Sequence, residues 1–233
     1  MLSIKKVPYF EKNNITKDEA TELIFNSPFF RYSPERKKRK ENLMESLVSI
    51  LEDKQFLMKN LEKIIREKYP IQTWLNNPIL RTKSKEVENI KDPEIQKFAD
   101  ILLVAMKMYD WIGLAAPQIG ENIRMIAVCQ LDKKEKNIIL TEVMINPEII
   151  ERKWEYICEE WCLSLPWLEW KVKRSKYVKV KYTTPEWEEK IIEAKNLNAA
   201  ILQHEIDHLD WILFWDKVIN KQPQININKL VQF

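Results

Sequence analysis

The sequence predicts an α+β protein, because helical and strand patterns follow one another without regular βαβ alternation. Residues 92–110, DPEIQKFADILLVAMKMYD, repeat apolar positions at helical spacing, with Pro93 in the first turn, where proline is tolerated. Three segments rich in β-branched residues follow as candidate strands, at residues 123–131, 138–146 and 176–184. Residues 196–214, NLNAAILQHEIDHLDWILF, are expected to form the final helix.

The chain length suits one domain with an appendage. Its 233 residues can bury a proper core, but they leave little room for two large domains. Residues 1–70 are charged and helix-forming, and they predict an N-terminal helical extension of unknown role. Residues 71–220 are expected to form the main domain, and residues 221–233 a C-terminal tail.

Charge and hydropathy restrict where this protein can be located and which partners it can bind. With 38 basic and 35 acidic residues, the chain lacks the basic excess of a DNA-binding protein. The basic run at residues 36–40 is interpreted as a solvated surface, with ribosomal RNA contact as the alternative. No apolar run reaches the roughly 18 to 20 residues of a membrane span. The N-terminus has neither a secretory signal nor a transit-peptide composition, so a cytoplasmic location is expected.

The final helix contains a metal-binding pattern, HEIDH. His204 and His208 are four residues apart, so their imidazoles share one helical face and can bind one ion. Glu205 can point at that ion without binding it, which suits a general base for metal-activated water. The pattern also arises in charged surface helices, but these are the only 2 His of the chain, which favours the metal site.

A catalytic metal of this type takes three protein ligands and an open position. Neither His nor Glu follows His208, which weakens the interpretation as a zinc protease. Asp210 and Asp216 remain possible oxygen ligands, and Cys162 upstream is a softer candidate. The chain has 3 Cys, an odd number that favours reduced thiols, and the other two are interpreted as small buried apolar residues.

Three segments, in order, resemble the signature motifs of peptide deformylases. IGLAAPQIG at residues 112–120 resembles GxGxAAPQ, EWCLS at residues 160–164 resembles EGCLS, and QHEIDH at residues 203–208 resembles QHExDH. The resemblance extends from about residue 71 to 218. It implies a peptide-deformylase-like fold, with antiparallel sheets around a central HExxH helix, and makes residues 71–220 the expected catalytic domain.

The resemblance implies a metal-dependent hydrolase that removes the N-formyl group from the N-terminal methionine of nascent proteins and releases formate. Cys162, His204 and His208 would bind the metal, with Fe²⁺ expected and Zn²⁺, Ni²⁺ or Co²⁺ able to replace it. Glu205 would move protons between water, intermediate and leaving amine.

The same resemblance assigns substrate contacts. The Gln118 side chain and the backbone N–H of Leu163 would donate hydrogen bonds to the formyl oxygen as it gains negative charge. The extended peptide and its methionine side chain would contact four further residues, Ile112, Gly113, Leu197 and Ile201.

Two other functional classes remain open at this point. Cleavage of internal peptide bonds would favour another HExxH hydrolase, such as a small protease. Absence of metal, together with partner binding by the N-terminal helices, would favour an inactive homologue that acts as a binding module.

The glycine and tryptophan counts are unusual. The chain has 2 Gly and 9 Trp, whereas glycine makes up about 7% of ordinary proteins. Tryptophan replaces a motif glycine at Trp111, Trp161 and Trp211, and four more stand where glycine would be natural, namely Trp74, Trp167, Trp170 and Trp187. We hypothesise that the gene uses UGA for glycine and was translated as if UGA meant tryptophan. The alternative is that these are genuine tryptophans filling a core.

Overall fold

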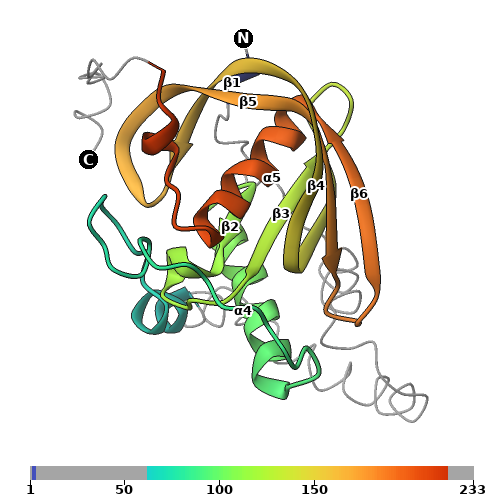
Figure 1. Ribbon diagram of the computed structural model, residues 1–233. Helices are drawn as coiled ribbons and strands as arrows, with labels where there is room; N and C mark the ends of the chain where they lie inside the picture. Colours follow the sequence, from blue (N-terminus) through green and yellow to red (C-terminus); the bar gives the residue numbers. More distant parts are fainter. Residues whose placement is uncertain (1, 4–61, 220–233) are drawn as a thin grey trace, which may run out of the picture. The chain divides into compact units, whose positions relative to one another are not determined.

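The computed structural model describes residues 2–3 and 62–219 (Figure 1). The chain divides into two units, one of residues 8–68 and one that combines residues 1–7 with residues 69–233. Residues 62–68 are helical, as the sequence predicts. The basic run at residues 36–40, most of the N-terminal extension and the C-terminal tail lie outside the described residues.

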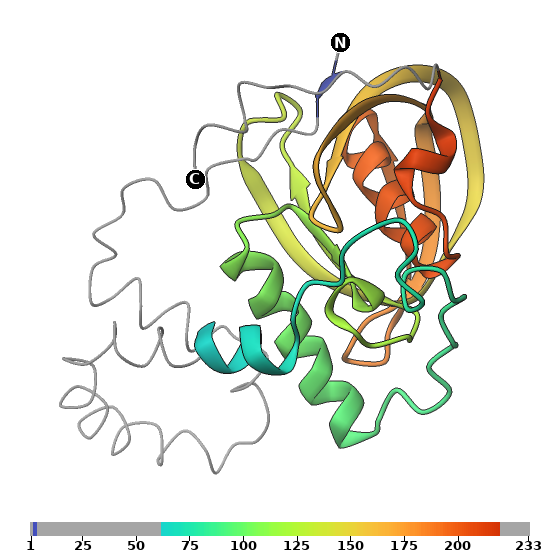
Figure 2. The same ribbon diagram turned by 90° about the vertical axis from the view of Figure 1, so that its left-hand side faces the viewer.

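Within residues 2–3 and 62–219, six strands form one sheet in the order β2, β3, β4, β5, β6, with β1 beside β4. Their bounds are β1 Leu2–Ser3, β2 Gly113–Ala115, β3 Met125–Leu131, β4 Ile138–Cys162, β5 Leu165–Thr183 and β6 Glu189–Lys195. All neighbours pair antiparallel except β1, which pairs parallel with β4. The long strands β4 and β5 bend together and curl over helix α5 (Figure 1, Figure 2).

The two main helices differ in their surroundings. Helix α4, Pro93–Met108, begins at the N-cap Asp92, whose side chain accepts a hydrogen bond from the N–H of Glu94, and it buries a single face. Helix α5, Asn196–Leu209, buries residues on all sides and contacts β2, β3 and β5. A helix buried all round belongs to the core, so polar groups on α5 need partners inside the protein. Two 3₁₀ turns complete the unit, η3 Ala116–Ile119 and η4 Phe214–Lys217.

The sequence predicts the positions of these elements better than their lengths. The three predicted strands lie in β3, β4 and β5, but β4 and β5 extend much further, and β2 and β6 are additional. The prediction that the last helix runs to residue 214 is wrong, because α5 ends at Leu209. There the backbone of Trp211 turns left-handed with φ 60°, which stops the helix.

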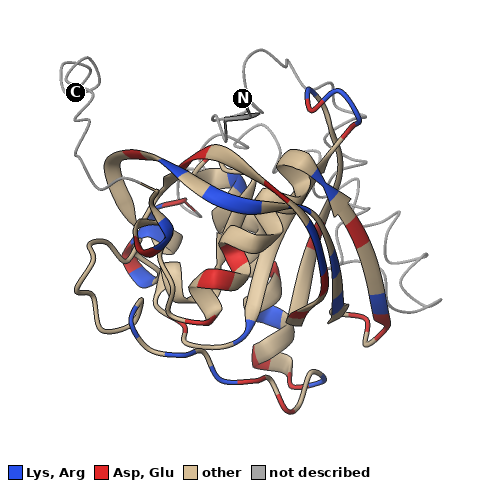
Figure 3. Ribbon diagram, turned by 45° about the horizontal axis from the view of Figure 1, so that its top comes forward, with Lys and Arg blue, Asp and Glu red and all other residues tan. Residues whose placement is uncertain are grey.

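Charged residues of both signs alternate along β4, β5 and β6, and acidic residues also appear on the enclosed helix α5 (Figure 3). Pairs such as Lys179–Glu193, 3.2 Å apart, join neighbouring strands at the surface, where an ion pair contributes little stability. In the part of the chain that the structure describes, no helix is long and apolar enough to cross a membrane.

Candidate metal centre and active site

Cys162, His204 and His208 come together where the end of β4 meets α5. Their ligand atoms all lie within 4.8 Å of one another, and all three residues are buried. Cys162 Sγ is 3.2 Å from His208 Nε2. One thiolate and two imidazoles form a donor set for a borderline-soft divalent ion, with a fourth position left for water or substrate. This is the ligand set that the family resemblance implies.

The two aspartates that the sequence leaves open as oxygen ligands have other partners. Asp210 Oδ1 lies 2.6 Å from Arg124 Nη1, and Asp216 Oδ2 lies 2.6 Å from Arg81 Nη1. Both carboxylates therefore form ion pairs near the ends of α5 and η4, and neither belongs to the cluster of possible metal ligands.

A buried carboxylate orients the first histidine. Glu160 Oε2 lies 2.8 Å from His204 Nδ1, which leaves His204 Nε2 for a metal. Arg174 donates to both Glu160 oxygens, at 2.6 and 2.8 Å, and both side chains are almost fully buried. Burial alone would raise the pKa of Glu160, but Arg174 outweighs it and holds this pKa well below its usual range. Glu160 is therefore an ionised acceptor, the usual partner of a metal-binding histidine.

The ion-pair network continues behind the metal cluster. Arg174 also pairs with Asp207, whose oxygens accept from Lys217 Nζ at 2.7 and 2.6 Å. Arg174 was not predicted from the sequence, because nothing in the pattern of a strand reveals which of its basic residues points inward. Glu160 could have been noticed, since it opens the EWCLS motif.

Replacing Glu160 with glutamine is expected to weaken metal binding by about 10- to 100-fold, the usual effect of losing such a partner. The amide keeps the shape of the carboxylate but not its charge, so His204 becomes a weaker ligand. Competition with a chelator measures the change in metal affinity. Glu159→Gln serves as the neighbouring control on β4, and an unchanged affinity in Glu160→Gln would contradict the role.

Glu205 lies beside the metal cluster against strand β2. Its Oε2 has no hydrogen-bond partner among the described residues, and burial raises the pKa of this carboxyl to about 7. A Cβ atom at position 113 would overlap the Glu205 carboxylate, so a larger residue there would displace this side chain. A carboxyl group with a pKa near neutrality can both accept and return a proton.

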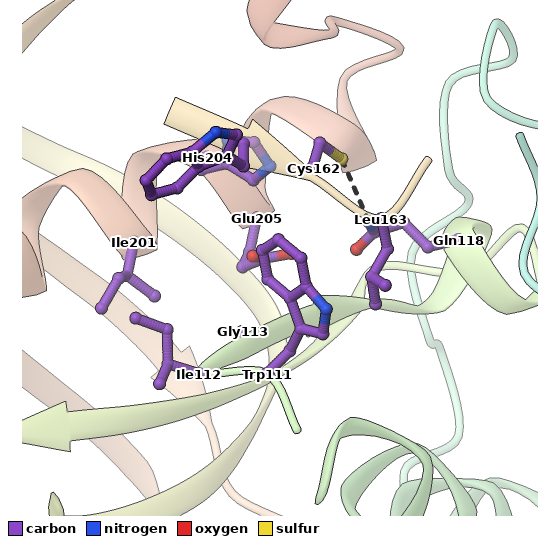
Figure 4. Close-up of a pocket in the computed structure, with 10 residues that line it drawn as sticks. Trp111, Ile112, Gly113, Gln118, Cys162, Leu163, Ile201, His204 and Glu205 are labelled. Atoms are coloured by element: carbon purple, nitrogen blue, oxygen red, sulfur yellow. Dashed lines mark hydrogen bonds between the residues drawn. The ribbon is translucent and has the colours of Figure 1, made fainter. Parts of the chain in front are cut away.

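Gln118 reaches the same space from η3. Its Oε1 accepts a hydrogen bond from the N–H of Ala115 at 2.8 Å, which fixes the side chain. Its Nε2 lies 3.4 Å from Cys162 Sγ (Figure 4). The same atom lies 3.3 Å from Ser164 Oγ. The amide N–H groups therefore point toward the metal cluster.

A pocket joins these groups, and Figure 4 shows it. The residues that line it are Trp111, Ile112, Gly113, Gln118, Trp161, Cys162, Leu163, Ile201, His204 and Glu205. The structure thus brings together nearly all site residues expected from the sequence. Leu197 is buried one turn before Ile201 on α5, but it does not line this pocket.

Comparison with known proteins identifies the family of this chain. The family model described as polypeptide deformylase matches residues 69–224. The chain belongs to the polypeptide deformylase family. The peptide deformylase of Dictyoglomus thermophilum is 40% identical over 147 residues, which cover 63% of this chain and 91% of that relative.

Solved deformylase structures share the fold. The enzyme of Thermotoga maritima matches with a TM-score of 0.59 and 33% identity, over 65% of this chain and 98% of the other. A class I type b peptide deformylase from Acinetobacter baumannii, with Met-Ala-Ser bound, matches with a TM-score of 0.60 and 31% identity, over 64% and 98% of the two chains. The α+β deformylase fold and the deformylase activity predicted from the motifs are confirmed. Deformylases depend on a metal ion and act on N-formylmethionyl nascent peptides.

Proposed function

We propose that this deformylase hydrolyses the formyl group in the pocket between β2, the β4–β5 turn and α5. The observation that carries the assignment is the convergence of three ligand atoms within 4.8 Å, beside the buried carboxyl of Glu205. Cys162, His204 and His208 hold the metal ion. This donor set suits Fe²⁺, which the family commonly uses, and it also accepts Zn²⁺, Ni²⁺ or Co²⁺.

Different residues of the protein transfer protons and stabilise the negative charge that develops on the formyl oxygen. A divalent ion in this site supplies Lewis acidity, which makes water more acidic and polarises the formyl group. Glu205 accepts the proton of the attacking water and later returns it to the leaving amine. Its raised pKa suits both steps, because a group near neutrality exchanges protons in either direction at cellular pH. Formate and a free N-terminal methionine are the products.

Gln118 Nε2 and the backbone N–H of Leu163 are assigned to the formyl oxygen. Gln118 is held by Ala115, so its donors are in place before the substrate arrives. Replacing Gln118 with alanine is expected to lower kcat by about 10²- to 10³-fold, as in other enzymes that lose one such donor. Steady-state kinetics with Trp111→Gly and Trp161→Gly in both proteins measures the loss, and the metal content should stay unchanged. A kcat within a few-fold of the parent would contradict the assignment.

Strand β2 offers an edge for the peptide. It is the first strand of the sheet path and pairs only with β3 among the described strands, so its other edge can pair with an extended peptide. Gly113 lies at this edge, next to Glu205, whereas the Ile112 carbonyl accepts from the N–H of Cys129 on β3, so Ile112 is assigned to the substrate through its place in the pocket lining. Ile201 lines the same pocket and is assigned to the methionine side chain, together with Leu197 one turn earlier on α5, as the family resemblance implies.

The remaining parts of the chain are assigned by the sequence analysis. Residues 71–220 serve as the catalytic domain, residues 1–70 as a helical extension and residues 221–233 as a tail. The basic run at residues 36–40 is the candidate for a transient ribosome contact, which agrees with action on nascent chains in the cytoplasm.

Mass spectrometry of a longer peptide that begins with formylmethionine tests this function. The protein is loaded with Fe²⁺ anaerobically, both as written and with Trp111→Gly, Trp161→Gly and Trp211→Gly. Loss of the formyl group alone, with every internal bond intact, is the expected result for the glycine variant. Cleavage of internal bonds with the formyl group retained would overturn the proposal and favour a protease.

A further inference from the structure

Tryptophan occupies backbone positions that strongly favour glycine. Among the described residues, nine that are not glycine have positive φ, and five of these are tryptophans. Three of the others are Asn or Asp, which adopt this conformation readily. A bulky side chain in the left-handed region is a genuine outlier. The five positions, with their φ values, are Trp74 (80°), Trp154 (51°), Trp167 (74°), Trp187 (70°) and Trp211 (60°).

Trp211 shows most clearly what its position requires. The N–H of Ile212 donates to the Asp207 carbonyl at 2.9 Å, and the N–H of Trp211 donates to His208 O at 3.3 Å. These two hydrogen bonds define a Schellman helix end, in which the residue after the C-cap turns left-handed and is usually glycine. This end follows directly after the metal-binding turn of α5.

Two more of the five tryptophans with positive φ lie where the backbone is irregular. On β4, Trp161 and Cys162 are adjacent, but their partners on β5 are Glu169 and Leu165, so residues 166–168 form a bulge that contains Trp167. Trp187 lies in the turn before β6, where its N–H donates to Thr184 O at 2.9 Å. Bulges and tight turns are where glycine supplies positive φ without strain.

Burial does not explain these five tryptophans, since their side chains are 45% to 66% exposed. Trp170 and Trp215 are different. Neither has positive φ, Trp170 is only 7% exposed, and the two rings meet edge to face with centroids 4.7 Å apart. The prediction that Trp170 stands where glycine would be natural is wrong, because its indole packs in the core against Trp215.

Trp111 and Trp161 have ordinary backbone angles, but their indoles lie in the active-site pocket. The free volume among the lining side chains is about 10 Å³, roughly what one water molecule needs. Figure 4 shows the indole of Trp111 rising beside Glu205 and Leu163. A methionine side chain and a formyl group are far larger than one water, so the two indoles would have to move for the substrate to enter this space.

We propose that the working enzyme carries glycine at seven of its tryptophan positions, the five left-handed ones together with Trp111 and Trp161, and keeps Trp170 and Trp215. A single codon, UGA, translated as tryptophan where the cell uses it for glycine, would account for all seven tryptophans. For the five left-handed positions, the proposal of glycine depends on backbone conformation alone. For positions 111 and 161, it depends on the proposed function of the pocket. Substrate access then depends on glycine at positions 111 and 161.

Thermal unfolding tests the conformational part. A variant in which the five left-handed tryptophans are replaced by glycine is expected to melt about 5 to 10 °C higher than the chain as written, because the strain is removed. The matched control, Trp170→Gly, should lower the melting temperature, because it leaves a cavity beside Trp215. An unchanged or lower melting temperature for the five-fold variant would overturn the proposal.

Peptide mass mapping of the protein purified from its own cells reads the residues directly. Glycine masses at all seven positions, with tryptophan at Trp170 and Trp215, would support the proposal. Tryptophan at any of the seven would overturn the proposal there. Neither experiment measures deformylase activity, so a failure here is distinguishable from a failure of the proposed function.

Discussion

Replacing Glu205 with glutamine is expected to lower kcat/KM for formyl-Met-Ala-Ser by about 10²- to 10⁴-fold, the usual contribution of a positioned general acid–base group. The amide has the shape of the carboxyl group, so it keeps the contact with Gly113, but it cannot accept the proton of water. Formate release, measured in the Trp111→Gly, Trp161→Gly background, gives the rate.

Metal content is the control for this prediction. Glu205 is not a ligand in the proposed site, so the variant should bind the metal as the parent does. A variant that keeps its metal and retains activity within a few-fold of the parent would show that another group moves the proton.

Replacing Cys162 with alanine is expected to abolish stable metal binding and, with it, formate release. Two imidazoles without the thiolate leave the ion with two protein ligands, below the three of a catalytic site. The loss of affinity should exceed the roughly 10- to 100-fold expected from an outer partner such as Glu160. Metal analysis after dialysis against a weak chelator measures it.

Cys129→Ala is the matched control, because Cys129 is also buried but its thiol lies 3.7 Å from Thr141 Oγ1, on β4. This variant should retain the metal. Full metal retention in Cys162→Ala would show that the third ligand is a different residue.

The sequence predicts those features that depend on local spacing. The apolar repeat and the N-cap of α4 are local, so residues 92–110 closely match Pro93–Met108. The HEIDH spacing likewise places His204 and His208 on one face of α5. The third ligand is distant in sequence, and its assignment came from the family motifs rather than from spacing.

Features that depend on long-range contacts were not predictable in the same way. The great length of β4 and β5 comes from their pairing with each other, which is invisible in either segment alone. The ion pair of Glu160 with Arg174 joins the paired strands β4 and β5, so it depends on a pairing that neither segment shows alone. The tryptophan anomaly was visible in the composition, but only the backbone angles separate Trp170 from Trp167.

The most direct test of the whole account is formate release from formyl-Met-Ala-Ser under anaerobic conditions with Fe²⁺. The chain as written is compared with a variant carrying Trp111→Gly, Trp161→Gly and Trp211→Gly, and Glu205→Ala is added to each. We expect formate release by the glycine variant, little or none by the chain as written, and none after Glu205→Ala. No release by either protein, with both folded and metal-bound, would contradict the deformylase assignment.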